Sequence, residues 1–293
     1  MTILETQGLA ARHAERVLAV AGTAQKNRAL EAIARALKER ESAILAENQK
    51  DLAAARESGM KASLLDRLAL SPQRIDGIVE GVRQVAALPD PIGCVTRMEK
   101  RPNGLVIGKR RVPLGVIGII YEARPNVTVD AAALCLKSGN AVILRGGKEA
   151  FRSNKAFVAV MRDALEAAGL PRDCVALVED TSRASAQELM GLTGYLDVLI
   201  PRGGAGLIRT VVENARVPVI ETGVGVCHVY VDGEADLDMG ARILYNAKTS
   251  RPSVCNAAEC LLVHAQAAEA FLPKAKALLD QNPNPSEAEI KKA

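Results

Sequence analysis

The pattern of apolar and polar positions changes once along the chain, near residue 114. Before it, residues 5–58 are rich in Ala, Leu and Glu, and apolar residues recur every three or four positions, which predicts helix. Gly59 is a candidate cap for the end of this helical region. Residues 60–88 predict shorter helices, and Ser71-Pro72 has the N-cap and first-turn proline that begin one.

After residue 114, short apolar runs alternate with helical stretches. The runs have the length of buried strands and cover residues 116–120, 141–144, 175–178, 198–200, 217–220 and 229–231. The helices predicted between them cover residues 127–137, 153–168, 182–192 and 205–215. Strands that alternate with helices indicate a parallel sheet covered on both faces, and such sheets bind nucleotides at the carboxyl ends of their strands. The sequence therefore predicts an α/β fold with a Rossmann-type parallel sheet.

Residues 95–113 interrupt this pattern with basic, strand-like runs on either side of Pro102-Asn103-Gly104. Asn-Gly between two strands is typical of a β-hairpin. A hairpin this exposed and charged either projects into solvent or pairs with another chain, and the residues favour neither.

Composition narrows the class of protein. The 293 residues are enough for one large or two ordinary domains, and the net charge of +4 is too small to indicate nucleic-acid binding. No apolar run approaches the roughly 20 residues that cross a bilayer, and residues 1–30 lack a signal peptide's apolar segment, so we expect a cytoplasmic protein with no membrane partner. The cysteines form no C-x-x-C pair and the three histidines lie far apart, so we expect neither a disulfide framework nor a metal site.

Two loops that follow predicted strands could bind an anion. Arg145-Gly146-Gly147-Lys148, after residues 141–144, combines two glycines with two cations, which suits a phosphate. Gly203 and Gly204 precede the helix predicted over 205–215, where backbone N–H groups can approach a phosphate. A solvated turn explains the first loop equally well, and the second lacks the G-x-G-x-x-G pattern of a dinucleotide site.

Two polar residues follow other predicted strands. Asn126 is either an N-cap or an amide donor to a developing oxyanion. Glu221 is either a local cap or an acid/base group.

Cys255 is the candidate nucleophile. It lies on a loop interrupted by Pro252, with Lys248 and Arg251 upstream, and nearby cations lower the pKa of a thiol and favour the reactive thiolate. The alternative is a buried structural cysteine, which is how most free cysteines behave.

Four segments together resemble the gamma-glutamyl phosphate reductase family of the aldehyde dehydrogenase superfamily. They are Tyr121–Asn126 (YEARPN), Leu136–Ala141 (LKSGNA), Arg145–Glu149 (RGGKE) and Arg251–Asn256 (RPSVCN). The resemblance extends from near the N-terminus to about Pro273. It implies an oxidoreductase of proline biosynthesis, which uses NADPH to reduce L-glutamyl 5-phosphate to L-glutamate 5-semialdehyde and releases phosphate.

The resemblance also implies catalytic roles. Cys255 matches the nucleophile that forms a thioester, and Asn126 matches the oxyanion-hole residue. Glu221 matches the superfamily's general base, although net reduction of an acyl phosphate needs no activated water. Arg124, Lys248 and Arg251 flank the catalytic loops, where the anionic substrate would arrive, but ordinary surface charge explains each of them singly.

For the cofactor, the resemblance implies that Arg145 and Lys148 contact the adenosine ribose of NADP(H), where a cation at 148 suits the extra phosphate. Gly203 and Gly204 match the loop that holds the pyrophosphate and nicotinamide. The hairpin at 95–113 matches the element through which subunits of the family associate, so it implies a homo-oligomer.

The predicted organisation is an NADP-binding domain over residues 1–228 and a partial catalytic domain with an unmatched polar tail over residues 229–293. The catalytic domain of the family continues further, so we expect an incomplete catalytic domain with Cys255 exposed or mobile. Small errors in positioning cost much of a catalyst's rate, so we expect weak or absent turnover. The alternative function is a non-catalytic dinucleotide-binding or interaction fragment.

Overall fold

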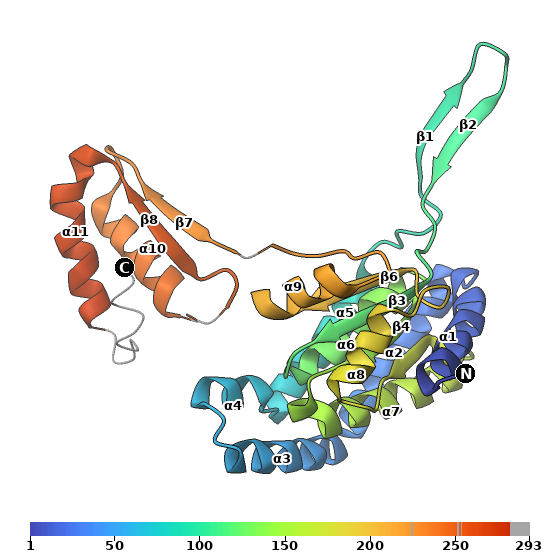
Figure 1. The fold of residues 1–293 in the computed structure, drawn as a ribbon. Helices are drawn as coiled ribbons and strands as arrows, with labels where there is room; N and C mark the ends of the chain where they lie inside the picture. Colours follow the sequence, from blue (N-terminus) through green and yellow to red (C-terminus); the bar gives the residue numbers. More distant parts are fainter. Residues whose placement is uncertain (224, 251, 253, 282–293) are drawn as a thin grey trace. The chain divides into compact units, whose positions relative to one another are not determined.

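The computed structural model describes residues 1–223, 225–250, 252 and 254–281 (Figure 1). The chain divides into two compact units, Met1–Thr222 and Gly223–Ala293. This boundary lies before residue 228, because the strand that begins at Cys227 pairs inside the second unit. No helix in the described part of the chain is both long enough and apolar enough to cross a membrane.

The first unit begins with five helices: α1 Ile3–Ala19, α2 Thr23–Glu39, α3 Glu41–Glu57, α4 Ala62–Leu68 and α5 Pro72–Ala87. The helical region predicted over 5–58 is therefore three helices, interrupted at Gly22 and Arg40. Gly59 has φ +73°, the left-handed conformation that commonly follows a helix end, as predicted. Ser71 Oγ accepts the N–H of Arg74 at 3.2 Å, which confirms the predicted cap of α5.

The hairpin consists of β1 Val95–Lys100 and β2 Val106–Arg110, which pair antiparallel as predicted. The Gly104 N–H donates to the carbonyl of Arg101 at 2.9 Å, and Gly104 has φ +88°, so the turn is longer than a two-residue loop. Every residue of β2 is exposed, and the hairpin extends away from the helices of its own unit (Figure 1).

The sheet of the first unit contains β3 Val116–Tyr121, β4 Ala141–Arg145, β5 Val175–Leu177 and β6 Val198–Arg202. All four strands are parallel, in the order β5-β4-β3-β6. The helices that connect them are α6 Pro125–Lys137, α7 Phe151–Ala167, α8 Arg183–Met190 and α9 Ala205–Asn214, with single turns η1 Lys148–Ala150 and η2 Arg172–Cys174. All of β3 is buried, which explains why its sequence is continuously apolar rather than alternating.

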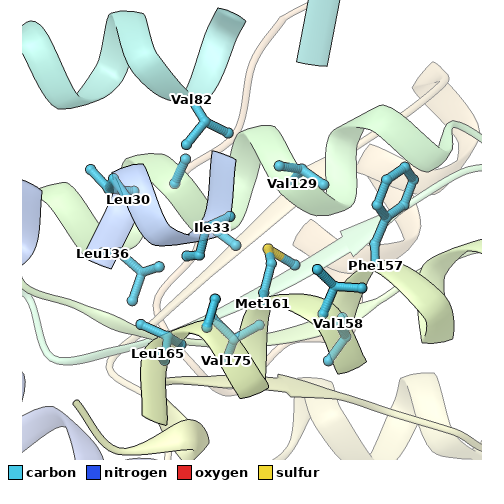
Figure 2. Close-up of a cluster of buried hydrophobic side chains, with 14 of the residues drawn as sticks. Leu30, Ile33, Val82, Val129, Leu136, Phe157, Val158, Met161, Leu165 and Val175 are labelled. Atoms are coloured by element: carbon cyan, nitrogen blue, oxygen red, sulfur yellow. The ribbon is translucent and has the colours of Figure 1, made fainter. Parts of the chain in front are cut away.

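Two hydrophobic clusters cover the two faces of this sheet. Helices α2, α5, α6 and α7 pack on the face that carries Ile117, Ile119 and Val142, whereas α1, α8 and α9 pack on the face that carries Ile143 and Leu199. Figure 2 shows the first cluster, in which Met161 lies among aliphatic side chains of α2, α6 and α7. Closely packed, mainly aliphatic side chains on both faces therefore hold the strands of the sheet in place.

The second unit contains β7 Cys227–Val231, α10 Leu237–Thr249, β8 Ala258–Val263 and α11 Ala265–Asp280. Its two strands are parallel, and Val231, Ala241, Leu244, Phe271 and Ala275 form a small core.

Two predicted strands differ from the structure. Residues 217–220 form no strand, and their backbone pairs with β6 only at the bridge between Leu199 and Val219, because Pro218 has no N–H to donate to a ladder. The run 229–231 does form a strand, but it belongs to the sheet of the second unit.

Candidate functional site

The predicted cofactor loops meet at the carboxyl edge of the first unit's sheet. Ile120 is in register with Arg145 on one side, and Tyr121 is in register with Arg202 on the other. The chain passes from β3 to β4 in one direction, and the later strand β6 lies on the opposite side of β3. Open parallel sheets bind ligands at the carboxyl ends of the strands where the order reverses in this way.

Gly203 and Gly204 connect β6 to α9. Gly204 is the N-cap of α9, and its N–H donates to Glu122 Oε1 at 2.7 Å. A Cβ atom on Gly203 would lie 2.7 Å from the carboxyl of the same glutamate, so a side chain at 203 would force the Glu122 side chain to move. The predicted phosphate-binding turn therefore already holds a carboxylate from the neighbouring strand's loop.

Glu122 is a residue that sequence reasoning missed. It lies in the YEARPN segment, and the signal that identifies it is a carboxylate directly after a buried strand and opposite a glycine loop.

Arg145 and Lys148 play different parts in the loop after β4. Arg145 is half-buried, and its Nη2 donates to the carbonyl oxygens of Thr181 at 2.8 Å and Ser182 at 2.9 Å. Desolvation lowers the pKa of its guanidinium, while the charge of Asp180 acts in the opposite direction. Lys148 is exposed, and its side chain makes no hydrogen bond or ion pair with the described residues. Arg145 thus braces the loop after β5, and Lys148 is the cation of this loop that is available to a ligand.

Asn126 is not the N-cap of α6, so that alternative is wrong. Arg124 is the N-cap, Pro125 follows it, and Asn126 lies in the first turn, because proline is favoured at the first helical position. The Asn126 Nδ2 donates to Asp130 Oδ2 at 3.0 Å, one turn along the helix. An amide nitrogen carries two hydrogens, so the second one can still reach a ligand.

Arg124 and Glu221 are both exposed and make no side-chain hydrogen bond or ion pair with the described residues. Neither residue is held in one orientation by a neighbour. Their predicted roles in substrate binding and as a general base stay predictions.

Cys255 lies in the second unit, on the loop between α10 and β8, and it is exposed. Its carbonyl oxygen accepts the thiol of Cys227 at 3.5 Å, and a Cβ atom on Gly225 would lie 2.6 Å from the same oxygen. The segment that enters β7 therefore packs against the backbone of the predicted nucleophile. Lys248, in the last turn of α10, pairs with Glu259 at 3.6 Å. Arg251 lies outside the described residues.

The class of enzyme to which this fold and these loops belong is shown by comparison with known families. The sequence profile of the aldehyde dehydrogenase family matches residues 2–287, and the chain belongs to that family. It is 62% identical over 278 residues to gamma-glutamyl phosphate reductase of Moorella thermoacetica, covering 95% of this chain and 66% of the relative. It is 61% identical to the reductase of the same name from Carboxydothermus hydrogenoformans, covering 93% and 66%.

A solved structure gives the same result. The crystal structure of gamma-glutamyl phosphate reductase from Thermotoga maritima superimposes with a TM-score of 0.87 at 44% identity, covering 98% of this chain and 74% of that one. The predicted aldehyde-dehydrogenase-like α/β fold and the family resemblance are therefore confirmed. The chain spans about two thirds of the length of the curated relatives that it matches.

Proposed function

We propose that this chain carries the cofactor site and the nucleophile of an NADP(H)-dependent reductase that converts L-glutamyl 5-phosphate to L-glutamate 5-semialdehyde. The observation that carries the proposal is the register of β3 with β4 and β6. It places the loops of Asn126, Lys148 and Gly203-Gly204 at one sheet edge. The high identity to reductases named for this substrate supports the choice of reaction.

The residues at the sheet edge fit a phosphorylated dinucleotide. The N-terminus of α9 offers backbone N–H groups to a pyrophosphate, and exposed Lys148 offers a point charge to the extra phosphate of NADP(H). Arg145 supports the adjoining loop through its two bonds to backbone carbonyls. When bound, the cofactor supplies a hydride.

Cys255 supplies the covalent step. Its thiolate attacks the acyl carbon of the substrate, the bond from that carbon to the phosphate oxygen breaks, and inorganic phosphate leaves with the electron pair. The product of this step is a thioester, and reduction of the thioester releases the aldehyde and restores the thiolate. The free amide hydrogen of Asn126 would stabilise the negative oxygen that forms during attack.

The charged candidates complete the proposal. Arg124 and Lys248 would attract the carboxylate and phosphate of the substrate, as would Arg251. Glu221 is assigned only as a candidate acid/base group, since net reduction needs no activated water.

The test is phosphate-dependent reduction of NADP⁺ by glutamate semialdehyde, the reverse reaction, with this 293-residue chain. Cys255→Ala should abolish it, and Cys94→Ala is the matched control, because both cysteines are exposed. Activity that survives Cys255→Ala would remove the nucleophile from the proposal.

Cofactor choice has its own test. Lys148→Glu should weaken NADPH binding about tenfold to a hundredfold, because a charge-assisted contact contributes about 1.5–3 kcal/mol, and it should change NADH binding far less. Equal effects on the two cofactors would contradict the role of Lys148.

The second candidate function is dinucleotide binding without turnover. The packing of the first unit favours it, since that unit has hydrophobic clusters on both sheet faces and bears all the predicted cofactor residues. Tight NADPH binding with no turnover would select this candidate.

A further inference from the structure

Glu122 lies between the two glycine loops of the sheet edge. Its Oε1 accepts the N–H of Gly204 at 2.7 Å, and its own N–H donates to the carbonyl of Arg202 at 3.3 Å. A Cβ atom on Gly203 would lie 2.7 Å from its carboxyl carbon, and one on Gly147 would lie 3.3 Å from its backbone carbonyl carbon. Both loops therefore lack side chains where they pack against Glu122.

The Glu122 carboxylate offers α9 the same chemistry as a phosphate. The first N–H groups of a helix have no partner within the helix, and the helix dipole favours an anion beside them. The side chain is exposed and reaches Gly204 across 82 positions of sequence from a neighbouring strand. Its flexible stem allows it to leave when a stronger anion arrives.

We propose that Glu122 is a tethered competitor for the pyrophosphate site: its carboxylate holds the Gly204 N–H when no dinucleotide is bound and is displaced when one binds. This inference rests on the proposed cofactor binding. Two anions cannot accept the same N–H at full strength. The cofactor must therefore displace the Glu122 carboxylate, and the free energy of that contact reduces the net free energy of cofactor binding. The usual strength of an anion at an exposed helix N-terminus corresponds to an apparent affinity lowered by about twofold to fivefold.

The competitor also keeps the Gly204 N–H satisfied when no dinucleotide is bound. The carboxylate would instead raise cofactor affinity if Glu122 contacted a ribose hydroxyl of the cofactor directly. In that case removal of the carboxylate would weaken binding instead of strengthening it, so one measurement separates the two.

The experiment is a titration of the 293-residue chain and its variants with NADPH and, separately, with inorganic pyrophosphate. Glu122→Gln keeps the shape of the side chain and removes its charge, and Glu122→Ala removes the contact. We expect both variants to bind both probes about twofold to fivefold more tightly than the parent chain. Glu149→Gln is the matched control, because it removes the same charge from the adjacent loop and makes no hydrogen bond with the described residues. We expect it to change either affinity by less than about twofold, since its carboxylate does not occupy an N–H donor.

Unchanged or weaker binding of both probes by Glu122→Gln would overturn the inference. An increase in affinity of the same size in Glu149→Gln would also overturn it, because the loss of any nearby negative charge would then explain the effect. If the chain and its variants bind pyrophosphate but not NADPH, and Glu122→Gln still binds it more tightly, the inference stands and the proposed function fails. Absence of binding to either probe by every variant overturns both.

Discussion

Removing one partner of the buried ion pair between Lys26 and Asp90 should be among the most destabilising single changes in the first unit. The Lys26 Nζ lies 2.5 Å from Asp90 Oδ2, and the two side chains are 2% and 10% exposed. Asp90 also accepts the hydroxyl of Thr23 at 2.8 Å and the N–H of Ile92 at 3.0 Å. The pair joins α2 to the segment that leads into the hairpin.

Lys26→Met keeps the buried stem and removes the ammonium group, leaving the Asp90 carboxylate without its cation. We expect a loss of about 3–5 kcal/mol in the free energy of unfolding at pH 7, the usual cost of breaking a buried pair on one side. The double variant Lys26→Met with Asp90→Asn should recover part of this loss, because the buried Asp90 carboxylate is removed together with its bonded cation. The recovery should be incomplete, because buried Lys137 then loses the nearby charge of Asp90. Lys38→Met is the matched control: Lys38 contacts two carboxylates but is half exposed, so its loss should be about 1 kcal/mol or less.

The same pair makes the free energy of unfolding depend on pH. Desolvation raises the pKa of Asp90, but the Lys26 bond and the other two hydrogen bonds outweigh it, so the net pKa is lowered from 3.8. A carboxyl whose folded pKa is lowered contributes stability above its unfolded pKa and loses it as the pH falls through the folded value. The cost of Lys26→Met should therefore shrink below about pH 3.8.

The measurement is urea unfolding followed by far-ultraviolet circular dichroism at pH 7 and pH 3. A loss below about 1 kcal/mol at pH 7, or a loss of the same size at both pH values, would refute the reasoning.

Three further predictions concern helix capping, thiols and the hairpin. Asp51→Ala should cost about 1–3 kcal/mol in urea unfolding, because this buried carboxylate accepts two N–H groups at the start of α7, and a loss under 0.5 kcal/mol would contradict it. Burial raises the pKa of Cys135 and Cys174 to about 12, so both should resist a thiol reagent in the folded protein and react in urea, whereas Cys255 should react at once. Ile107→Asp, on the exposed hairpin, should lower the oligomeric mass measured by light scattering while leaving NADPH affinity unchanged; an unchanged mass would exclude the hairpin as the contact.

The strands of the first unit's sheet could be predicted from the sequence, because burial on both faces requires continuous runs of apolar residues. The runs at 116–120 and 141–144 are continuously apolar, since helices cover both faces of the sheet. The strand predicted over 217–220 failed because apolar residues do not guarantee ladder hydrogen bonds when Pro218 lacks a donor. Asn126 was an ambiguous cap because Pro125 takes the first helical position, which moves the N-cap back to Arg124.

The sequence by itself determined the parallel α/β sheet, the loops at its carboxyl edge and the exposed thiol of Cys255 as a candidate, because periodicity and local turn chemistry depend on near neighbours. Only the tertiary structure decided that Glu122 holds Gly204, that Arg145 braces the loop after β5, and that β7 pairs in the second unit. These outcomes depend on which strands lie side by side. Strand order is set by packing between segments far apart in the chain, which no local pattern records.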